Sequence, residues 1–151
     1  MAGIIGAHHT SFTVADLDRS LAFFRGALGL EVVFVRDVRA DYFDRVVGLR
    51  DCEVRAALLR IPHSEHHVEL FQYVRPAGEV HRPRPCDPGS AHLALLVDDL
   101  HGFARQLRAK GAVAGEPVEI TAGPNRGGCA LYLRDPNGIV IELFQRPPPK
   151  P

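Results

Sequence analysis

The chain has 151 residues, 46% of them hydrophobic, which suits one compact domain and leaves too little length for two ordinary ones. Its 18 basic and 18 acidic side chains cancel, so we expect no nucleic-acid partner and no attraction to an anionic membrane. Because the sequence shows neither a signal peptide nor an apolar stretch of the roughly 20 residues that span a membrane, we expect a cytoplasmic protein.

The first half of the chain has the residue pattern of a strand, a helix and three more strands. Asp16 can cap the helix and Gly29 can stop it. The apolar face of this helix is expected at Leu17, Leu21, Phe24 and Leu28. The expected elements are a strand over residues 5–14, the helix over 17–28, strands over 31–35, 55–61 and 67–73, and an irregular connection over 40–51 with room for a helical turn.

A segment rich in proline and glycine separates this half from a second one with the same order of elements. Strands are expected over 91–97, 118–121, 129–134 and 139–144, with a helix over 100–110 and a hairpin turn at Asp135-Pro-Asn-Gly138. We therefore predict one domain over residues 1–151, with a first module at about 4–75, a linker at 76–89, a second module at about 90–146 and a proline-rich tail at 147–151.

Two short segments of the first half recur in the second. In 9–17 and in 92–100, a histidine stands five residues before the valine that ends the strand, and Asp-Leu follows. The tetrapeptide Glu-Leu-Phe-Gln occurs at 69–72 and again at 142–145. The first copy holds more residues between its two segments, which the connection over 37–51 accommodates. The halves are therefore predicted to be structural repeats.

Each half carries one histidine and one glutamate at matching positions, His9 with Glu69 and His92 with Glu142. A carboxylate on the inner face of a curved sheet is costly to bury alone, and a bound metal ion removes that cost. Any one of these residues could instead be an ordinary core histidine or a solvent-facing glutamate. Because no structural demand requires the same pair in both halves, we predict that the four side chains hold one divalent ion; Zn, Ni, Co, Mn and Fe all suit them.

Three motifs mark the chain most strongly: His9-x4-Val14-x-Asp16-Leu17-x2-Ser20-x2-Phe23-Phe24, Leu28-Gly29-Leu30, and Asp135-Pro-Asn-Gly138-x3-Glu142-Leu. They resemble the vicinal oxygen chelate superfamily, also called the glyoxalase/bleomycin resistance/dioxygenase group, over residues 4–145. The resemblance implies an α+β fold in which two tandem βαβββ modules form a cupped eight-stranded mixed sheet around a metal. It places the metal ligands at His9, Glu69, His92 and Glu142, and it favours a homodimer.

The resemblance also implies a class of reaction. Four protein ligands leave two positions of an octahedron, which suit a small molecule with vicinal oxygens whose carbonyl the metal polarises. Members that resemble glyoxalase I and methylmalonyl-CoA epimerase transfer a proton beside such a carbonyl, so we expect a metal-dependent lyase, isomerase or epimerase with Glu142 or Glu69 as the base. Two alternatives remain, an extradiol-type non-haem iron dioxygenase and a protein that sequesters a small molecule such as an antibiotic without catalysis.

Substrate contacts are harder to assign from sequence. The candidates for substrate binding are Arg126 and Asn125 in the glycine-rich loop and Tyr132 in the strand after it. Arg126 could instead be a solvated surface charge, and the other two could only pack or cap. Arg75, at the end of the first module, and Arg82 and Arg84 in the linker are candidates of the same kind. His8 is expected to point away from His9, because side chains alternate along a strand. The two modules could close on each other within one chain or be exchanged between two chains.

Overall fold

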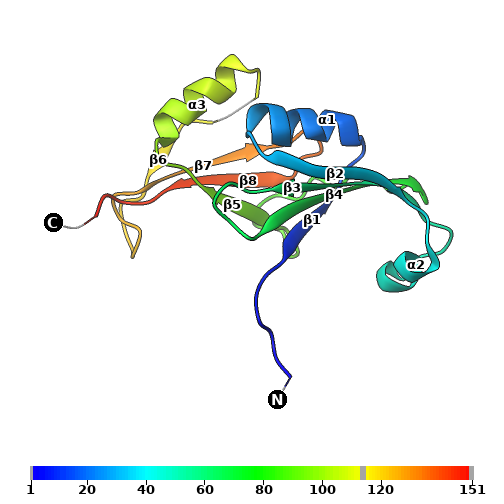
Figure 1. Cartoon of the computed structure of the whole chain (residues 1–151). Helices are drawn as coiled ribbons and strands as arrows, with labels where there is room; N and C mark the ends of the chain where they lie inside the picture. The colour runs from blue at the N-terminus through cyan, green and yellow to red at the C-terminus, as the bar shows by residue number, and fades with distance from the viewer. Residues whose placement is uncertain (1, 113–114, 150–151) are drawn as a thin grey trace. The chain divides into compact units, whose positions relative to one another are not determined.

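Each half of the chain folds into a strand, a helix and three further strands, in the order that the repeat predicts (Figure 1). The computed structural model describes residues 2–112 and 115–149. It divides into two compact units, residues 1–80 (unit 1) and residues 81–151 (unit 2), and the division falls within the predicted linker.

Unit 1 is a four-stranded mixed sheet with a helix along one face. Its elements are β1 (His9–Thr13), α1 (Leu17–Leu21), η1 (Ala22–Ala27), β2 (Glu31–Val38), α2 (Asp41–Val47), β3 (Glu53–Arg60) and β4 (His67–Arg75). The strand order is β1-β4-β3-β2, with β1 parallel to β4 and the other neighbours antiparallel. Figure 1 shows α1 lying along the sheet and α2 beyond the strand ends.

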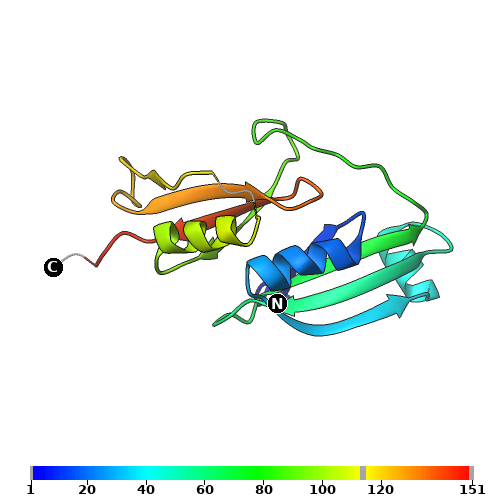
Figure 2. The ribbon, with the colours of Figure 1, turned by 90° about the horizontal axis from the view of Figure 1, so that it is seen from above.

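Unit 2 repeats this plan with a shorter edge strand. Its elements are β5 (His92–Leu96), α3 (Leu100–Ala109), β6 (Val118–Glu119), β7 (Cys129–Arg134) and β8 (Val140–Gln145). The strand order is β5-β8-β7-β6, and β5 is again parallel to β8. In Figure 2, seen from above, the helix of each unit lies over its own sheet. The α+β class with two βαβββ modules is therefore confirmed, while their closure into one eight-stranded sheet stays a prediction.

Strand alternation gives each sheet two different faces. In β4, Val68 and Leu70 are fully buried beneath the helix, and Glu69 and Phe71 project to the opposite face. The repeated tetrapeptide places the same residue types on the same two faces of β8. The face away from the helix is therefore where each glutamate lies.

The glutamine of the tetrapeptide fixes the start of the helix in each unit. Gln72 Oε1 accepts a hydrogen bond from the backbone N–H of Leu17 at 3.0 Å, and Gln145 Oε1 accepts one from Leu100 at 2.8 Å. Both helices also have an aspartate N-cap. The repeated Glu-Leu-Phe-Gln segment thus joins the last strand of each module to its helix.

The first helix departs from the predicted apolar pattern. α1 continues directly into the π-helix η1, where Leu28 N–H donates to the carbonyl of Phe23, five residues earlier, at 3.0 Å. Of the predicted apolar face, Leu17, Phe24 and Leu28 are buried and Leu21 is only half-buried. Ser20 and Phe23 are buried in addition. Gly29 ends the helix with a φ of +80°, as predicted.

The connection over residues 40–51 is more regular than expected, because it folds into α2 and closes an apolar cluster. Phe43 of α2 packs edge-on against Phe71 of β4, with ring centroids 5.4 Å apart. The other buried members of this cluster are Val38, Cys52, Val54 and Ala56. The residues that the first copy has in excess therefore form a small helix that unit 2 lacks among its described residues.

The remaining strand predictions are confirmed with small shifts at the ends. β1 starts at His9, later than the predicted residue 5, while β7 has the predicted bounds. The Asp135 carboxylate accepts hydrogen bonds from the N–H groups of Asn137 and Ile139, at 2.8 Å each, which fixes the predicted hairpin turn. Within the predicted tail, residues 147–149 form no helix or strand, and 150–151 lie outside the described residues.

None of the helices in the described part of the chain is both long enough and apolar enough to span a membrane.

We predict that Gln145→Met lowers the free energy of unfolding by about 1 to 2 kcal/mol, because the Leu100 N–H loses its acceptor while the size of the side chain is kept. Chemical denaturation of the two proteins measures the difference. Gln106→Met, on the exposed face of α3, is the matched control and should cost close to nothing. Equal losses in the two variants would contradict the capping role.

Candidate metal centre

Parallel pairing of the first and last strands of unit 1 places His9 beside Glu69. His9 lies opposite His67, which is two residues before Glu69 and on the same face of β4. The Nε2 atom of His9 lies 3.4 Å from Oε2 of Glu69, and the two side chains are 39% and 19% exposed. The carboxylate is thus mostly shielded, whereas the imidazole remains open to solvent.

Unit 2 forms the same pair in the same register. His92 lies opposite Val140, two residues before Glu142. Its Nε2 atom is 3.0 Å from Oε2 of Glu142, and the side chains are 42% and 18% exposed. The two pairs therefore match in strand position, atoms and exposure, which is the symmetry that the sequence predicts.

The other ring nitrogen of each histidine has a different partner in each unit. His9 Nδ1 lies 2.7 Å from Nδ1 of His8, whereas His92 Nδ1 lies 3.5 Å from the hydroxyl of Tyr132. The expectation that His8 points away from His9 is wrong, because β1 begins at His9 and strand alternation does not extend to the residue before it. The sequence gives no signal for this contact beyond the two adjacent histidines.

Tyr132 lies directly opposite Glu142 on the neighbouring strand β7, and its ring packs against His92 with centroids 5.1 Å apart. Partial burial raises the pKa of Tyr132 above its ordinary value, and the negative charge of Glu142 raises it further. The phenol therefore keeps its proton at neutral pH and can donate a hydrogen bond at this site.

The donor atoms of the pairs have the chemistry that a divalent transition metal requires. In each pair an imidazole Nε2 and a carboxylate oxygen face each other, and two such pairs would supply two nitrogen and two oxygen donors. Within residues 2–112 and 115–149, no three His, Cys, Asp or Glu side chains are grouped closely enough to hold a metal. Each unit by itself thus provides one imidazole and one carboxylate, and a metal site shared by the two units stays a prediction.

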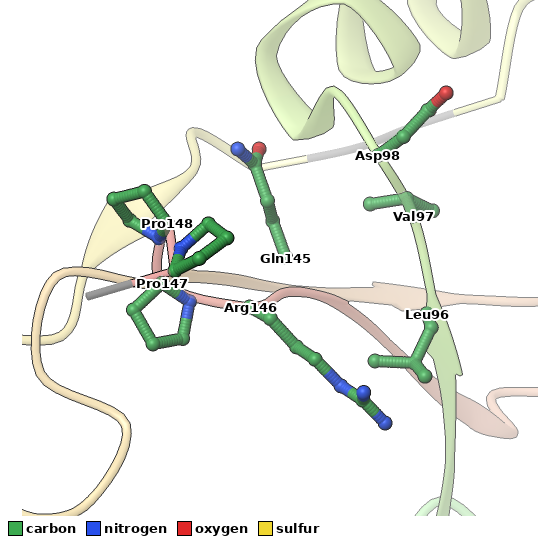
Figure 3. Close-up of a pocket in the computed structure, with 8 residues that line it drawn as sticks. Leu96, Val97, Asp98, Gln145, Arg146, Pro147 and Pro148 are labelled. Atoms are coloured by element: carbon green, nitrogen blue, oxygen red, sulfur yellow. The ribbon is translucent and has the colours of Figure 1, made fainter. Parts of the chain in front are cut away.

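Two surface pockets of unit 2 lie apart from its His–Glu pair. One, of about 480 Å³, is lined by Leu96, Val97, Asp98, Gln145, Arg146 and residues 147–149. Figure 3 shows the side chains of Gln145 and Arg146 pointing to opposite sides of the chain at this pocket. The other, of about 340 Å³, is lined by Arg82, Pro83, Arg84, Arg134, Asp135, Pro136 and Gly138. Neither pocket includes His92 or Glu142. The candidate site is therefore identified by the nitrogen and oxygen donors of the His–Glu pairs and not by these pockets.

Of the three predicted substrate contacts, Tyr132 is the one that the structure brings to a pair. Asn125 and Arg126 are exposed in the loop between β6 and β7. Their backbone groups close the loop. The N–H of Arg126 donates to the carbonyl of Gly123 at 3.3 Å, and the N–H of Gly128 donates to the carbonyl of Asn125 at 3.0 Å. A role for these two side chains in substrate binding stays a prediction.

Two of the other candidate arginines, Arg75 and Arg84, have acidic partners. Arg84 Nη2 lies 2.6 Å from Oδ1 of Asp87, and Arg75 Nη1 lies 3.8 Å from Oε1 of Glu53. Both arginines are largely exposed, so their interactions are those of ordinary surface ion pairs. The structure thus favours surface roles for these two over a role in gripping an anionic substrate.

Comparison with known families bears on what the two pairs are for. Residues 6–143 match the model of the Glyoxalase/Bleomycin resistance protein/Dioxygenase superfamily, a span that includes both His–Glu pairs. The chain belongs to this superfamily.

Proteins similar to this chain include enzymes. The chain is 35% identical to a 2-epi-5-epi-valiolone epimerase from Actinomyces sp. over 96% of its own length and 81% of that protein. It is 28% identical to a probable lactoylglutathione lyase from Vibrio parahaemolyticus, with coverages of 91% and 88%. A glyoxalase family protein from Bacillus cereus has the same fold, with a TM-score of 0.81, 22% identity and 97% coverage of each chain.

We predict that the pairs contribute little to the stability of the metal-free glyoxalase-superfamily fold, because their histidines are partly exposed. In excess chelator, Glu142→Gln should change the free energy of unfolding by less than about 1 kcal/mol in either direction. Glu31→Gln, which removes the exposed pair with Arg60, is the control. A loss above about 2 kcal/mol for Glu142→Gln alone would instead assign the pair a structural role.

Proposed function

We propose that this member of the glyoxalase superfamily is a divalent-metal-dependent isomerase or epimerase that moves a proton at a carbon next to a carbonyl group. The observation that carries the proposal is the matched geometry of the two pairs, with Nε2–Oε2 distances of 3.4 and 3.0 Å. Structural repeats alone would conserve packing positions and helix caps. They would not require an imidazole and a carboxylate facing each other in both modules.

His9, Glu69, His92 and Glu142 would together hold the ion, two from each module. When bound, a divalent metal polarises a substrate carbonyl and makes the adjoining C–H more acidic. The ion would account for the mostly shielded carboxylates, which are 19% and 18% exposed, because a metal compensates their partial loss of hydration. The identity of the metal is open among Zn, Ni, Co, Mn and Fe.

The carboxylates supply the proton-transfer groups of the proposed reaction. Epimerisation removes a proton from one face of a carbon and returns one to the other face, and Glu69 and Glu142 provide two equivalent bases, one in each module. Tyr132, whose hydroxyl stays protonated beside Glu142, can donate a hydrogen bond to a substrate oxygen. These roles use side chains on the faces of β4, β7 and β8 that lie away from the helices.

The 35% identity to a 2-epi-5-epi-valiolone epimerase favours epimerisation of a polar ketone over the lyase reaction of the more distant lactoylglutathione lyases. The oxygenase alternative uses the same donors with iron and would consume oxygen. The sequestering alternative predicts binding without turnover. The pairs could meet within one chain or between the chains of the homodimer that we expect.

We predict that the purified protein carries about one transition-metal ion per chain, measured by elemental analysis after equilibration with each ion. His9→Ala and His92→Ala should each abolish tight binding, because all four donors share one ion. His101→Ala, an exposed histidine of α3, should bind as the unaltered protein does. Two ions per chain, with one retained in each single variant, would show separate sites and refute the shared centre.

We predict that the metal-loaded protein exchanges a carbon-bound hydrogen of its substrate with deuterium from D₂O, followed by NMR with 2-epi-5-epi-valiolone and lactoylglutathione as first substrates. Glu142→Gln should fold normally and lose about 100-fold or more of the exchange rate, because it removes a base. Metal content, measured beside the rate, separates lost catalysis from lost metal. Undiminished exchange in the loaded variant would contradict the role of Glu142.

A further inference from the structure

The His9–Glu69 pair of unit 1 has a second imidazole next to it, on the side of His9 that faces away from Glu69. His8 Nδ1 lies 2.7 Å from Nδ1 of His9, the ring nitrogen that faces away from Glu69. The two rings meet edge to face, with centroids 5.0 Å apart and an interplanar angle of 83°. At this distance one of the two Nδ1 atoms must carry a hydrogen that the other accepts.

His8 is itself held by His67, the first residue of β4. The backbone N–H of His67 donates to the carbonyl of His8 at 3.1 Å. The rings of His8 and His67 stack with centroids 6.0 Å apart and an interplanar angle of 28°. A residue that precedes β1 is thus fixed by a backbone hydrogen bond and a ring contact, although its side chain is exposed.

The repeat does not account for this arrangement. His67 lies opposite His9 in unit 1, and in the same register Val140 lies opposite His92 in unit 2. The residue before His92 is Ala91. Unit 2 therefore has neither imidazole, and its His92 Nδ1 has only the longer 3.5 Å contact with Tyr132.

The contact links the tautomer of His9 to that of His8, because one Nδ1 donates and the other accepts. A neutral imidazole carries one N–H, so an Nε2 lone pair is free for a metal only when the hydrogen is on Nδ1. We propose that His8 is a positioning residue that accepts this hydrogen and holds His9 with its Nε2 lone pair directed toward Glu69, ready to bind the ion. The inference rests on the proposed metal site, since without an ion the opposite tautomers satisfy the same atoms.

The outer partners of metal-bound histidines fix ring orientation, and their loss typically costs about 10- to 100-fold in metal affinity. We therefore expect His8→Leu to raise the dissociation constant for Co²⁺ or Zn²⁺ by this factor, measured by competition with a chromogenic chelator. His8→Asn should restore most of the affinity, because its Oδ1 can accept where Nδ1 does. His101→Leu is the matched control and should bind as the unaltered protein does.

Tautomer measurement tests the same inference without activity or mutation. In the Zn²⁺-loaded protein, long-range ¹H–¹⁵N spectra should show hydrogen on Nδ1 of His9 and on Nε2 of His8. A His8 Nδ1 that carries hydrogen or binds the metal itself would overturn the inference. Equal dissociation constants for His8→Leu and His101→Leu would also overturn the role of His8. That result would not contradict the shared metal centre. Failure of the unaltered protein to bind either ion would overturn both proposals.

Discussion

Parallel pairing between the first and last strands of each module is the constraint on which the fold and the candidate site both depend. It brings a histidine from the start of the module beside a glutamate from its end, with Ser11 opposite Glu69 and Ala94 opposite Glu142. A register shift of one residue would turn the carboxylate toward the helix and the buried leucine away from it. The helix-capping glutamine at the end of the same strand opposes such a shift, because it must reach the helix start.

The two modules share this strand pairing and differ in the residues around the His–Glu pair. Unit 1 adds α2, whose Phe43 closes an apolar cluster with Phe71, and supports its site histidine with His8. Unit 2 instead places the hydroxyl of Tyr132 3.5 Å from Nδ1 of its histidine. A symmetric set of donors is thus set in asymmetric surroundings. In the proposed proton transfer, such asymmetry would let the two carboxylates take different roles.

The repeat makes most of the fold and the pairing of a histidine with a glutamate in each unit predictable. Strand positions follow from apolar alternation, and the Asp135 turn from its own residues. The π-helical turn was not predictable, because the apolar spacing of Leu17, Leu21, Phe24 and Leu28 fits an ordinary α-helix, and tertiary packing selects Phe23 over Leu21. The His8 contact was missed for a related reason: it depends on where β1 begins, and element ends are set by pairing with a distant strand, which local pattern does not reveal.

The claim that the two His–Glu pairs form one metal centre is tested most directly by anomalous diffraction from crystals of the metal-loaded protein, recorded at the absorption edge of the metal. We expect a single peak for each pair of modules, about 2.0 to 2.2 Å from Nε2 of His9 and His92 and from a carboxylate oxygen of Glu69 and Glu142. Separate peaks at the two pairs, or a peak held by other side chains while the pairs stay bound to each other, would contradict it.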